Sequence, residues 1–78
     1  MQMDWILYQR DDCCLCDEAL MVLAAARIPD FEPVWIDGKP DLDARYGIRI
    51  PVLRDVRSGR ELDWPFDALR VARFLRGD

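Results

Sequence analysis

The sequence contains no histidine, and this removes a large class of reactive sites. Without an imidazole there is no histidine acid–base catalysis and no Cys/His dyad, and most zinc sites are excluded. No apolar run approaches the ~20 residues of a membrane-spanning helix. Residues 1–4 lack the basic segment with which a signal peptide begins, so we expect a cytoplasmic protein in a reducing compartment.

Basic side chains are also few compared with acidic ones. The 78 residues carry 11 lysine and arginine against 15 aspartate and glutamate side chains, a net charge of −4. Nucleic acids and anionic membrane surfaces both bind basic patches, so we expect neither nucleic acid nor a membrane as a partner. The length fits a single domain, residues 1–78, which we expect to be a monomer. A hydrophobic fraction of 51% lets a modest core form without disulfide or metal staples.

Cysteine is absent outside one short segment: Cys13, Cys14 and Cys16 are the only cysteines of the chain. Disulfides that hold a fold together join distant segments, which this cluster cannot do. A structural zinc site needs four ligands, and three neighbouring thiols do not supply them. The cluster therefore indicates local chemistry, and no metal site is expected.

The hydrophobic pattern predicts alternating strands and helices. Strands are expected at residues 4–9, 31–37, 51–55 and 60–63, and helices from residue 13 to a break at 28–30, as a short turn at 41–46, and at 67–76. Asp12 is the expected N-cap of the first helix, Pro33 indicates an edge strand or an irregular strand start, and residues 57–59 supply a hairpin loop. The order β-α-β-(short α)-β-β-α predicts a mixed four-stranded α/β sheet, with the helices at the two ends of the chain covering its two faces.

Each long helix has one apolar face that we expect to point into the core. In the first helix these positions are Leu15, Ala19, Val22, Leu23 and Ala26. In the last they are Leu69, Ala72 and Leu75, with Val71 and Phe74 widening the stripe. The three tryptophans, Trp5, Trp35 and Trp64, are also assigned to the core; the alternative for Trp35 and Trp64 is an exposed side chain that contacts a partner.

The segment Cys13-x-x-Cys16 follows the first strand and begins the first helix. Three residues of a first helical turn bring the two Cα atoms within disulfide range, ~4.4–6.8 Å. The free N–H groups and positive dipole end of the helix stabilise a thiolate on Cys13, the nucleophile in thiol–disulfide exchange, and Cys16 then resolves the mixed disulfide. The pattern predicts a redox pair, with an inert pair or a metal ligand as the alternative. Cys14 is interpreted as an exposed bystander.

Four segments of the chain form a pattern that occurs together in one family. Arg10 precedes the C-x-x-C by three residues, and Arg49-Ile50-Pro51-Val52-Leu53 follows later, before the Ser58-Gly59 hairpin. Leu62-Asp63-Trp64-Pro65-Phe66-Asp67 then leads into the terminal helix. Together these segments resemble a glutaredoxin-like protein of the thioredoxin fold, of a compact bacterial subgroup, over nearly the whole chain.

The resemblance implies roles for individual residues. Cys13 would be the nucleophile and Cys16 the resolving thiol. Pro51 would be cis, would open the third strand and would face the cysteines. The backbone of Ile50 would be left free beside it, so that an extended peptide or glutathione can pair there.

The glutathione contacts differ from the family pattern. By the resemblance, Arg10 and Arg45 would receive the glutathione carboxylates and Asp67 would contact its amine. The family's Pro-Tyr pair between the cysteines is replaced by Cys14-Leu15, and its Gly-Gly segment by Trp64-Pro65. Four acids beside the motif oppose the single Arg10, a local sum of −3 that disfavours both the thiolate and anionic glutathione; they are Asp11, Asp12, Asp17 and Glu18. We therefore expect a less activated thiol than in a typical glutaredoxin.

These observations lead to one function and two alternatives. The leading hypothesis is a thiol–disulfide oxidoreductase that acts through Cys13 and Cys16 on protein or glutathione mixed disulfides, with no bound cofactor and glutathione as a co-substrate. One alternative is a thioredoxin-fold binding module with little redox turnover. The other is an iron–sulfur carrier that holds a cluster through Cys13 of two protomers and glutathione. Retention of Cys16 favours dithiol exchange over a single-thiol cluster carrier.

Overall fold

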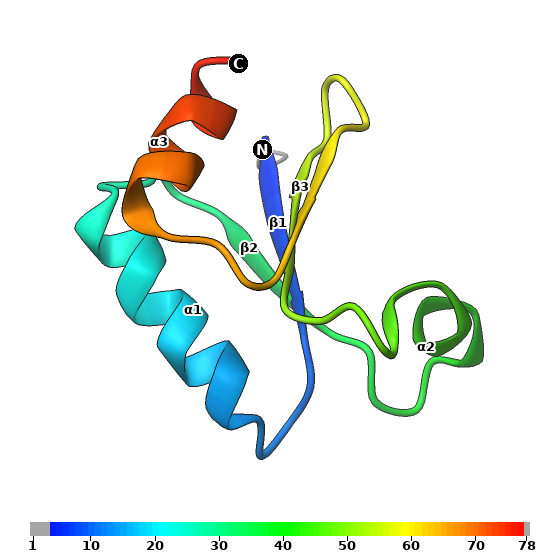
Figure 1. Ribbon diagram of the computed structural model, residues 1–78. Helices are drawn as coiled ribbons and strands as arrows, with labels where there is room; N and C mark the ends of the chain where they lie inside the picture. The colour runs from blue at the N-terminus through cyan, green and yellow to red at the C-terminus, as the bar shows by residue number, and fades with distance from the viewer. Residues whose placement is uncertain (1–3, 78) are drawn as a thin grey trace.

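Residues 4–77 form four strands and three helices in a computed structural model (Figure 1). The elements are β1 (Trp5–Gln9), α1 (Cys14–Ala25), β2 (Glu32–Trp35), α2 (Pro40–Tyr46), β3 (Val52–Asp55), β4 (Glu61–Asp63) and α3 (Ala68–Leu75). Residues 1–3, on which the expectation about a signal peptide partly rests, and residue 78 lie outside the described part of the chain.

The strands make one mixed sheet in the order β2-β1-β3-β4. β1 is parallel to β2 and antiparallel to β3, and β3 is antiparallel to β4. The predicted element order and mixed sheet are confirmed. β2 lies at an edge, as Pro33 indicated, because a proline cannot donate a hydrogen bond to a second neighbouring strand.

α1 and α3 pack together on one face of the sheet, and α2 lies on the other face (Figure 1). The strands alternate accordingly: Leu7 packs with α1 and α3, whereas the next residue, Tyr8, packs with α2. The first cluster contains Leu7, Ala19, Leu23, Leu53, Leu62, Phe66, Val71 and Phe74, and the second Tyr8, Ile36, Tyr46 and Val52. The sheet thus has helices on both faces, but the prediction that the two end helices lie on opposite faces is wrong, because they share one core.

The inward face of α1 is rotated from the predicted one only in its first turn: Ala19 and Leu23 are buried and Val22 and Ala26 pack against the same core, as predicted, whereas Leu15 does not. Cys16, Ala19 and Leu23 are its buried residues, whereas Leu15 is 46% exposed. The inward residues follow one another at three and four positions, which keeps them on a single stripe. In the first turn the apolar pattern alone did not distinguish Cys16 from Leu15, because cysteine was not counted among the core residues.

In α3 the predicted stripe is also rotated: Val71 and Phe74 are buried, whereas Leu69 is 61% exposed. The first and last helices are shorter than predicted. α1 stops before Pro29, since Arg27 takes a left-handed conformation with φ 56°, and α3 is followed by Gly77 at φ 87°. Within residues 4–77, no helix has the length and apolar character needed to cross a membrane.

Tyr46 anchors α2 to the sheet. Its fully buried ring stacks on Tyr8 with centroids 4.1 Å apart, and its hydroxyl donates a hydrogen bond of 2.5 Å to Glu61 Oε2. Burial, together with this bond, raises the pKa of Tyr46 to about 12. Arg49 binds Glu61 at 2.7 Å and Asp63 through two nitrogens at 3.0 and 2.8 Å. These contacts fix the segment that leads from α2 into Pro51 and β3.

Candidate functional site

The thiol of Cys13 caps the N-terminus of α1. β1 ends at Gln9, and the following turn places Asp12 in the left-handed region, at φ 52°, which aspartate tolerates better than most residues. Cys13 then accepts a hydrogen bond at its Sγ from the backbone N–H of Cys16, 3.2 Å away. The prediction of Asp12 as N-cap is wrong, because the chain turns one residue later. The helix therefore directs an N–H group and its dipole at the Cys13 sulfur, and both stabilise negative charge there.

Cys16 lies beneath Cys13 and is only 2% exposed. Burial raises the pKa of the Cys16 thiol to about 12, the hydrogen bond with Cys13 adds to this, and a backbone hydrogen bond from Arg10 acts in the opposite direction. Cys13 is half-buried and Cys14 is exposed, and all three are free thiols. The geometry gives the two cysteines of the motif different properties: Cys13 is accessible, whereas Cys16 is protonated at neutral pH and hidden.

Arg10 is paired with carboxylates from the other side of the site. Its Nη2 donates a hydrogen bond of 2.5 Å to Asp43 Oδ1, and its Nη1 lies 3.5 Å from Asp37 Oδ1. The bond to Asp43 raises the pKa of Arg10. The backbone N–H of Asp11 also donates to Asp37, at 2.8 Å. Arg10 therefore holds the turn before Cys13 against α2 and the end of β2, and two acids compensate its charge.

The acids next to the cysteines have no such compensation. Asp11, Asp12 and Asp17 line the space beside Cys13, and Glu18 is exposed next to them. None of the four makes an ion pair with a basic side chain of residues 4–77. The negative local charge expected from the sequence is therefore present, and the pairing of Arg10 makes it more pronounced.

A groove of about 480 Å³ opens beside the two cysteines. It is lined by the turn from Gln9 to Asp12, by Cys13, Cys16 and Asp17, and by the apolar side chains of Leu20, Phe31, Pro33 and Trp35, and we call it the Trp35 groove. Trp35 is 46% exposed, so its assignment to the core is wrong. Trp5 and Trp64 do pack against the core, Trp5 beside Phe74 and Trp64 edge-on to Phe66.

Pro51 lies at the same end of the sheet as the cysteines. The Ile50–Pro51 bond is cis, as the resemblance implied, and Pro51 is buried. Tyr8 pairs with Val52, so the register places Pro51 beside Gln9, the last residue of β1. The N–H of Ile50 is not free as expected, because it donates to the Tyr46 carbonyl at 3.0 Å. A second cis bond, Trp64–Pro65, was not anticipated.

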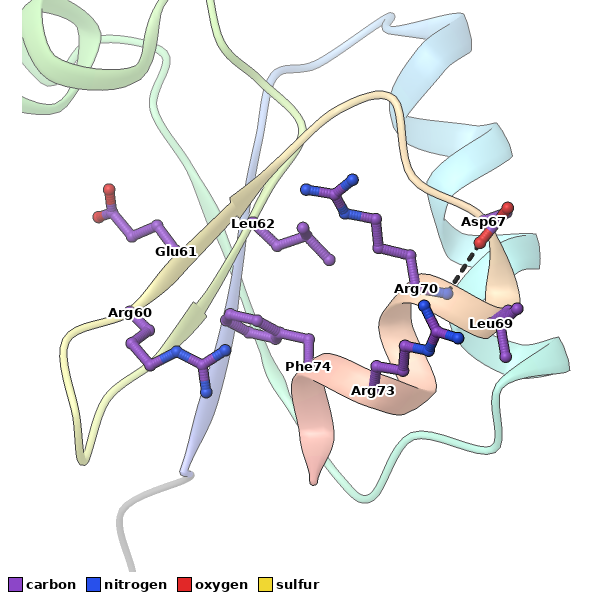
Figure 2. A pocket seen from close by; sticks show the side chains of 8 residues that line it. All are labelled: Arg60, Glu61, Leu62, Asp67, Leu69, Arg70, Arg73 and Phe74. Atoms are coloured by element: carbon purple, nitrogen blue, oxygen red, sulfur yellow. Dashed lines mark hydrogen bonds between the residues drawn. The ribbon is translucent and has the colours of Figure 1, made fainter. Parts of the chain in front are cut away.

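Asp67 and Arg45 are not among the residues that line the Trp35 groove. Asp67 is the N-cap of α3, and its side chain accepts the Arg70 N–H at 2.8 Å. It lines a second groove, of about 680 Å³, between β4 and α3, together with Arg60, Glu61, Leu62, Leu69, Arg70, Arg73 and Phe74 (Figure 2). Arg45 lies over the Tyr46 ring, 5.4 Å from its centroid. Of the side chains assigned to glutathione, the structure brings only Arg10 to the groove that contains the cysteines.

The family follows from comparison with known sequences and structures. Residues 5–76 match the family described as "Glutaredoxin-like domain (DUF836)". The chain belongs to this glutaredoxin-like family. No curated protein sequence matches it. Within residues 4–77, no group of three or more His, Cys, Asp or Glu side chains is placed to hold a metal ion.

Solved structures share the glutaredoxin-like fold. The X-ray structure of protein XcR50 from X. campestris is 54% identical, with a TM-score of 0.90, over 95% of this chain and 97% of that one. The solution structure of the same protein has a TM-score of 0.89 at 54% identity, over 97% of this chain and 96% of that one. Protein Ne2328 from Nitrosomonas europaea is 27% identical, with a TM-score of 0.76 and 95% of each chain covered.

The residues that complete the apolar wall around Trp35 are the part of the site that the sequence interpretation missed; they are Leu20, Phe31 and Pro33. Phe31, directly before β2, and Pro33 and Trp35 within it occupy alternate positions, and this period of two places all three side chains on one face. The face is only partly covered, since Pro33 and Trp35 are exposed and no strand within residues 4–77 pairs with the outer edge of β2. Large apolar side chains at alternate positions of an edge strand were the signal that could have found this wall.

Proposed function

We propose that this glutaredoxin-like protein is a thiol–disulfide oxidoreductase that acts through Cys13 and Cys16 on protein or glutathione mixed disulfides. The observation that carries the proposal is the asymmetry of the pair. Cys13 is accessible at the helix N-terminus and its sulfur accepts the Cys16 N–H, whereas Cys16 is buried and burial raises the pKa of its thiol to about 12. A nucleophile and a resolving thiol need this difference in exposure and charge.

The reaction proceeds in two exchanges. The Cys13 thiolate attacks one sulfur of the substrate disulfide, a Cys13–substrate disulfide forms, and the second substrate sulfur leaves as a thiolate that takes up a proton from water. Cys16 then attacks the Cys13 sulfur, and its proton passes to the sulfur of the departing substrate. The substrate gains two electrons and two protons in all, and the protein is left with a Cys13–Cys16 disulfide.

The test is the redox equilibrium of the pair. After equilibration in buffers of defined dithiothreitol or glutathione ratio, free thiols are alkylated and the protein is digested and mapped by mass spectrometry. We expect a Cys13–Cys16 disulfide as the main oxidised product, with a single two-electron transition. Cys14→Ser is the matched control, since Cys14 lies between the two cysteines and is exposed; this variant should keep the transition, whereas Cys13→Ser and Cys16→Ser should lose it.

Two results would contradict the proposal. One is a main product that joins Cys13 to Cys14 or links two chains. The other is a wild-type protein in which the pair forms, but which does not reduce any small disulfide faster than the Cys13→Ser variant does. The second result would leave a thioredoxin-fold binding module.

A further inference from the structure

The Trp35 groove leads away from the cysteines along the seam between α1 and β2. Cys13 and Cys16 stand at the end formed by the β1–α1 turn, and Leu20, Phe31 and Pro33 extend the lining along α1 and β2. Trp35 pairs with Gln9 at the end of β1, so its side chain lies beside this turn. A ligand that reacts at Cys13 therefore has an apolar channel in front of it, on the opposite side of β1 from Pro51 and β3.

The free edge of β2 also limits how a ligand can bind in the Trp35 groove. Ile36 donates its N–H to the Gln9 carbonyl, so residues 34 and 36 face β1, and residues 33 and 35 face outward. Pro33 has no N–H, which leaves Trp35 as the outward donor of this strand. An extended segment would therefore be held mainly by side-chain contacts in the groove and not by a continuous strand ladder.

Charge then selects between candidate substrates. The groove lining contains Asp11, Asp12 and Asp17 against one arginine, and Arg10 is already paired with Asp37 and Asp43. Glutathione has two carboxylates and one amine and no apolar side chain, so it matches neither the charge nor the apolar wall. A polypeptide with apolar and basic residues around its cysteine matches both.

We propose that the Trp35 groove binds an apolar, positively charged segment of a protein next to its disulfide, and that this chain reduces such disulfides in preference to those of anionic glutathione. The inference rests on the thiol–disulfide exchange proposed above, and the sulfur chemistry is the same. It adds the substrate class and the surface that recognises it.

The test compares two synthetic peptides that differ only in charge. Each has a single central cysteine blocked as its mixed disulfide with 2-mercaptoethanol, flanked by leucine and by either lysine or glutamate. The rate of peptide-thiol release by the reduced protein is measured, with 2-hydroxyethyl disulfide as a small neutral reference. We expect the cationic peptide to react about tenfold faster than the anionic one at low salt. The two rates should converge at about 1 M salt, where the screening length falls to ~3 Å.

Two charge-matched double variants test whether the charge preference arises in the Trp35 groove. Asp12→Asn/Asp17→Asn should remove most of the charge preference, and asparagine, like aspartate, tolerates the left-handed conformation of Asp12. Asp4→Asn/Asp30→Asn makes the same change in net charge at two exposed positions that do not line the groove, and it should retain the preference.

A second pair of variants tests the apolar wall. Trp35→Ala should slow the reduction of both peptides more than it slows the reduction of 2-hydroxyethyl disulfide. Leu20→Ala, which leaves Trp35 in place, should have the same effect. Met21→Ala, on the same helix but 74% exposed and outside the groove, is the control that should retain wild-type rates.

The outcomes separate the two proposals. A protein that does not react with 2-hydroxyethyl disulfide overturns the oxidoreductase function itself. A protein that reduces the small disulfide but treats both peptides alike, or prefers the anionic one, overturns only the substrate class. Equal loss of preference in the groove variant and its charge-matched control would also overturn the assignment to this groove.

Discussion

The buried position of Cys16 predicts a large difference in reactivity between two thiols that are two residues apart. In a Cys13→Ser variant, only Cys14, which is exposed, and Cys16, which is 2% exposed, remain to react with iodoacetamide. Burial is the main cause that raises the pKa of Cys16 to about 12, and this cause survives the substitution. The part of the increase that comes from Cys13 is lost in this variant, but burial still raises the pKa of Cys16, so its thiolate is scarce at pH 8.

The assay is alkylation at pH 8, followed by digestion and mass mapping over time. Cys14 is the internal reference in the same chain, and because it is exposed while Cys16 is buried, we expect it to react well over tenfold faster than Cys16. Unfolding in guanidinium chloride is the control, since it exposes Cys16 and should bring the two rates together. Native-state rates within tenfold of each other would show that Cys16 is neither buried nor held protonated, and the division of roles within the pair would then be wrong.

Three further outcomes test the surroundings of the site. Tyr46 has a pKa of about 12 in the fold against ~10 when unfolded, so it contributes stability that is present below pH 10 and is lost as the pH rises through 12. The loss amounts to at most ~2.7 kcal/mol. In unfolding experiments followed by circular dichroism over a series of alkaline pH values, Tyr46→Phe should show a smaller loss of stability over this range. Gly47→Ala would place a Cβ 2.5 Å from the Asp43 carbonyl oxygen and 2.7 Å from its carboxylate, and should lower the free energy of unfolding by ~1–3 kcal/mol in denaturant titrations. Asp12→Asn should speed alkylation of Cys13 at pH 7, because it removes one of the negative charges that line the groove beside this thiol, and equal rates for the two proteins would contradict this.

The fold was predictable to the extent that its signals are local. The order of strands and helices, the edge position of Pro33 and the C-terminal helix follow from short patterns that fix one element at a time. The faces of the helices were predictable only in part, since Ala19 and Leu23 point inward as expected whereas Leu15 and Leu69 do not. Whether Leu15 or Cys16 points inward depends on how α1 packs against the sheet, and a pattern of small and apolar residues fits either rotation.

In the candidate site too, the features that are local in the sequence were predictable and those that depend on distant residues were not. The Cys13-x-x-Cys16 pair is contained within one turn of helix, so the sequence was enough to predict it. The rest depends on residues far apart in the chain. Arg10 is bonded to Asp43, 33 positions away, and this contact gives it a role in holding the turn that no local pattern indicates. Asp67 caps its own helix, where the family resemblance had assigned it to a ligand.

The acids beside Cys13 have opposite effects on two steps of the proposed reaction. Asp11, Asp12 and Asp17 disfavour the thiolate, and so slow the chemical step for every disulfide. The same charges raise the local concentration of a cationic partner, and so speed its encounter with Cys13. Removing them should therefore speed the reduction of a small neutral disulfide while slowing that of a cationic peptide at low salt. A change in thiol reactivity alone would move both rates in the same direction. An increase in the rate for the neutral disulfide together with a decrease in the rate for the cationic peptide therefore separates substrate selection from simple activation of the nucleophile.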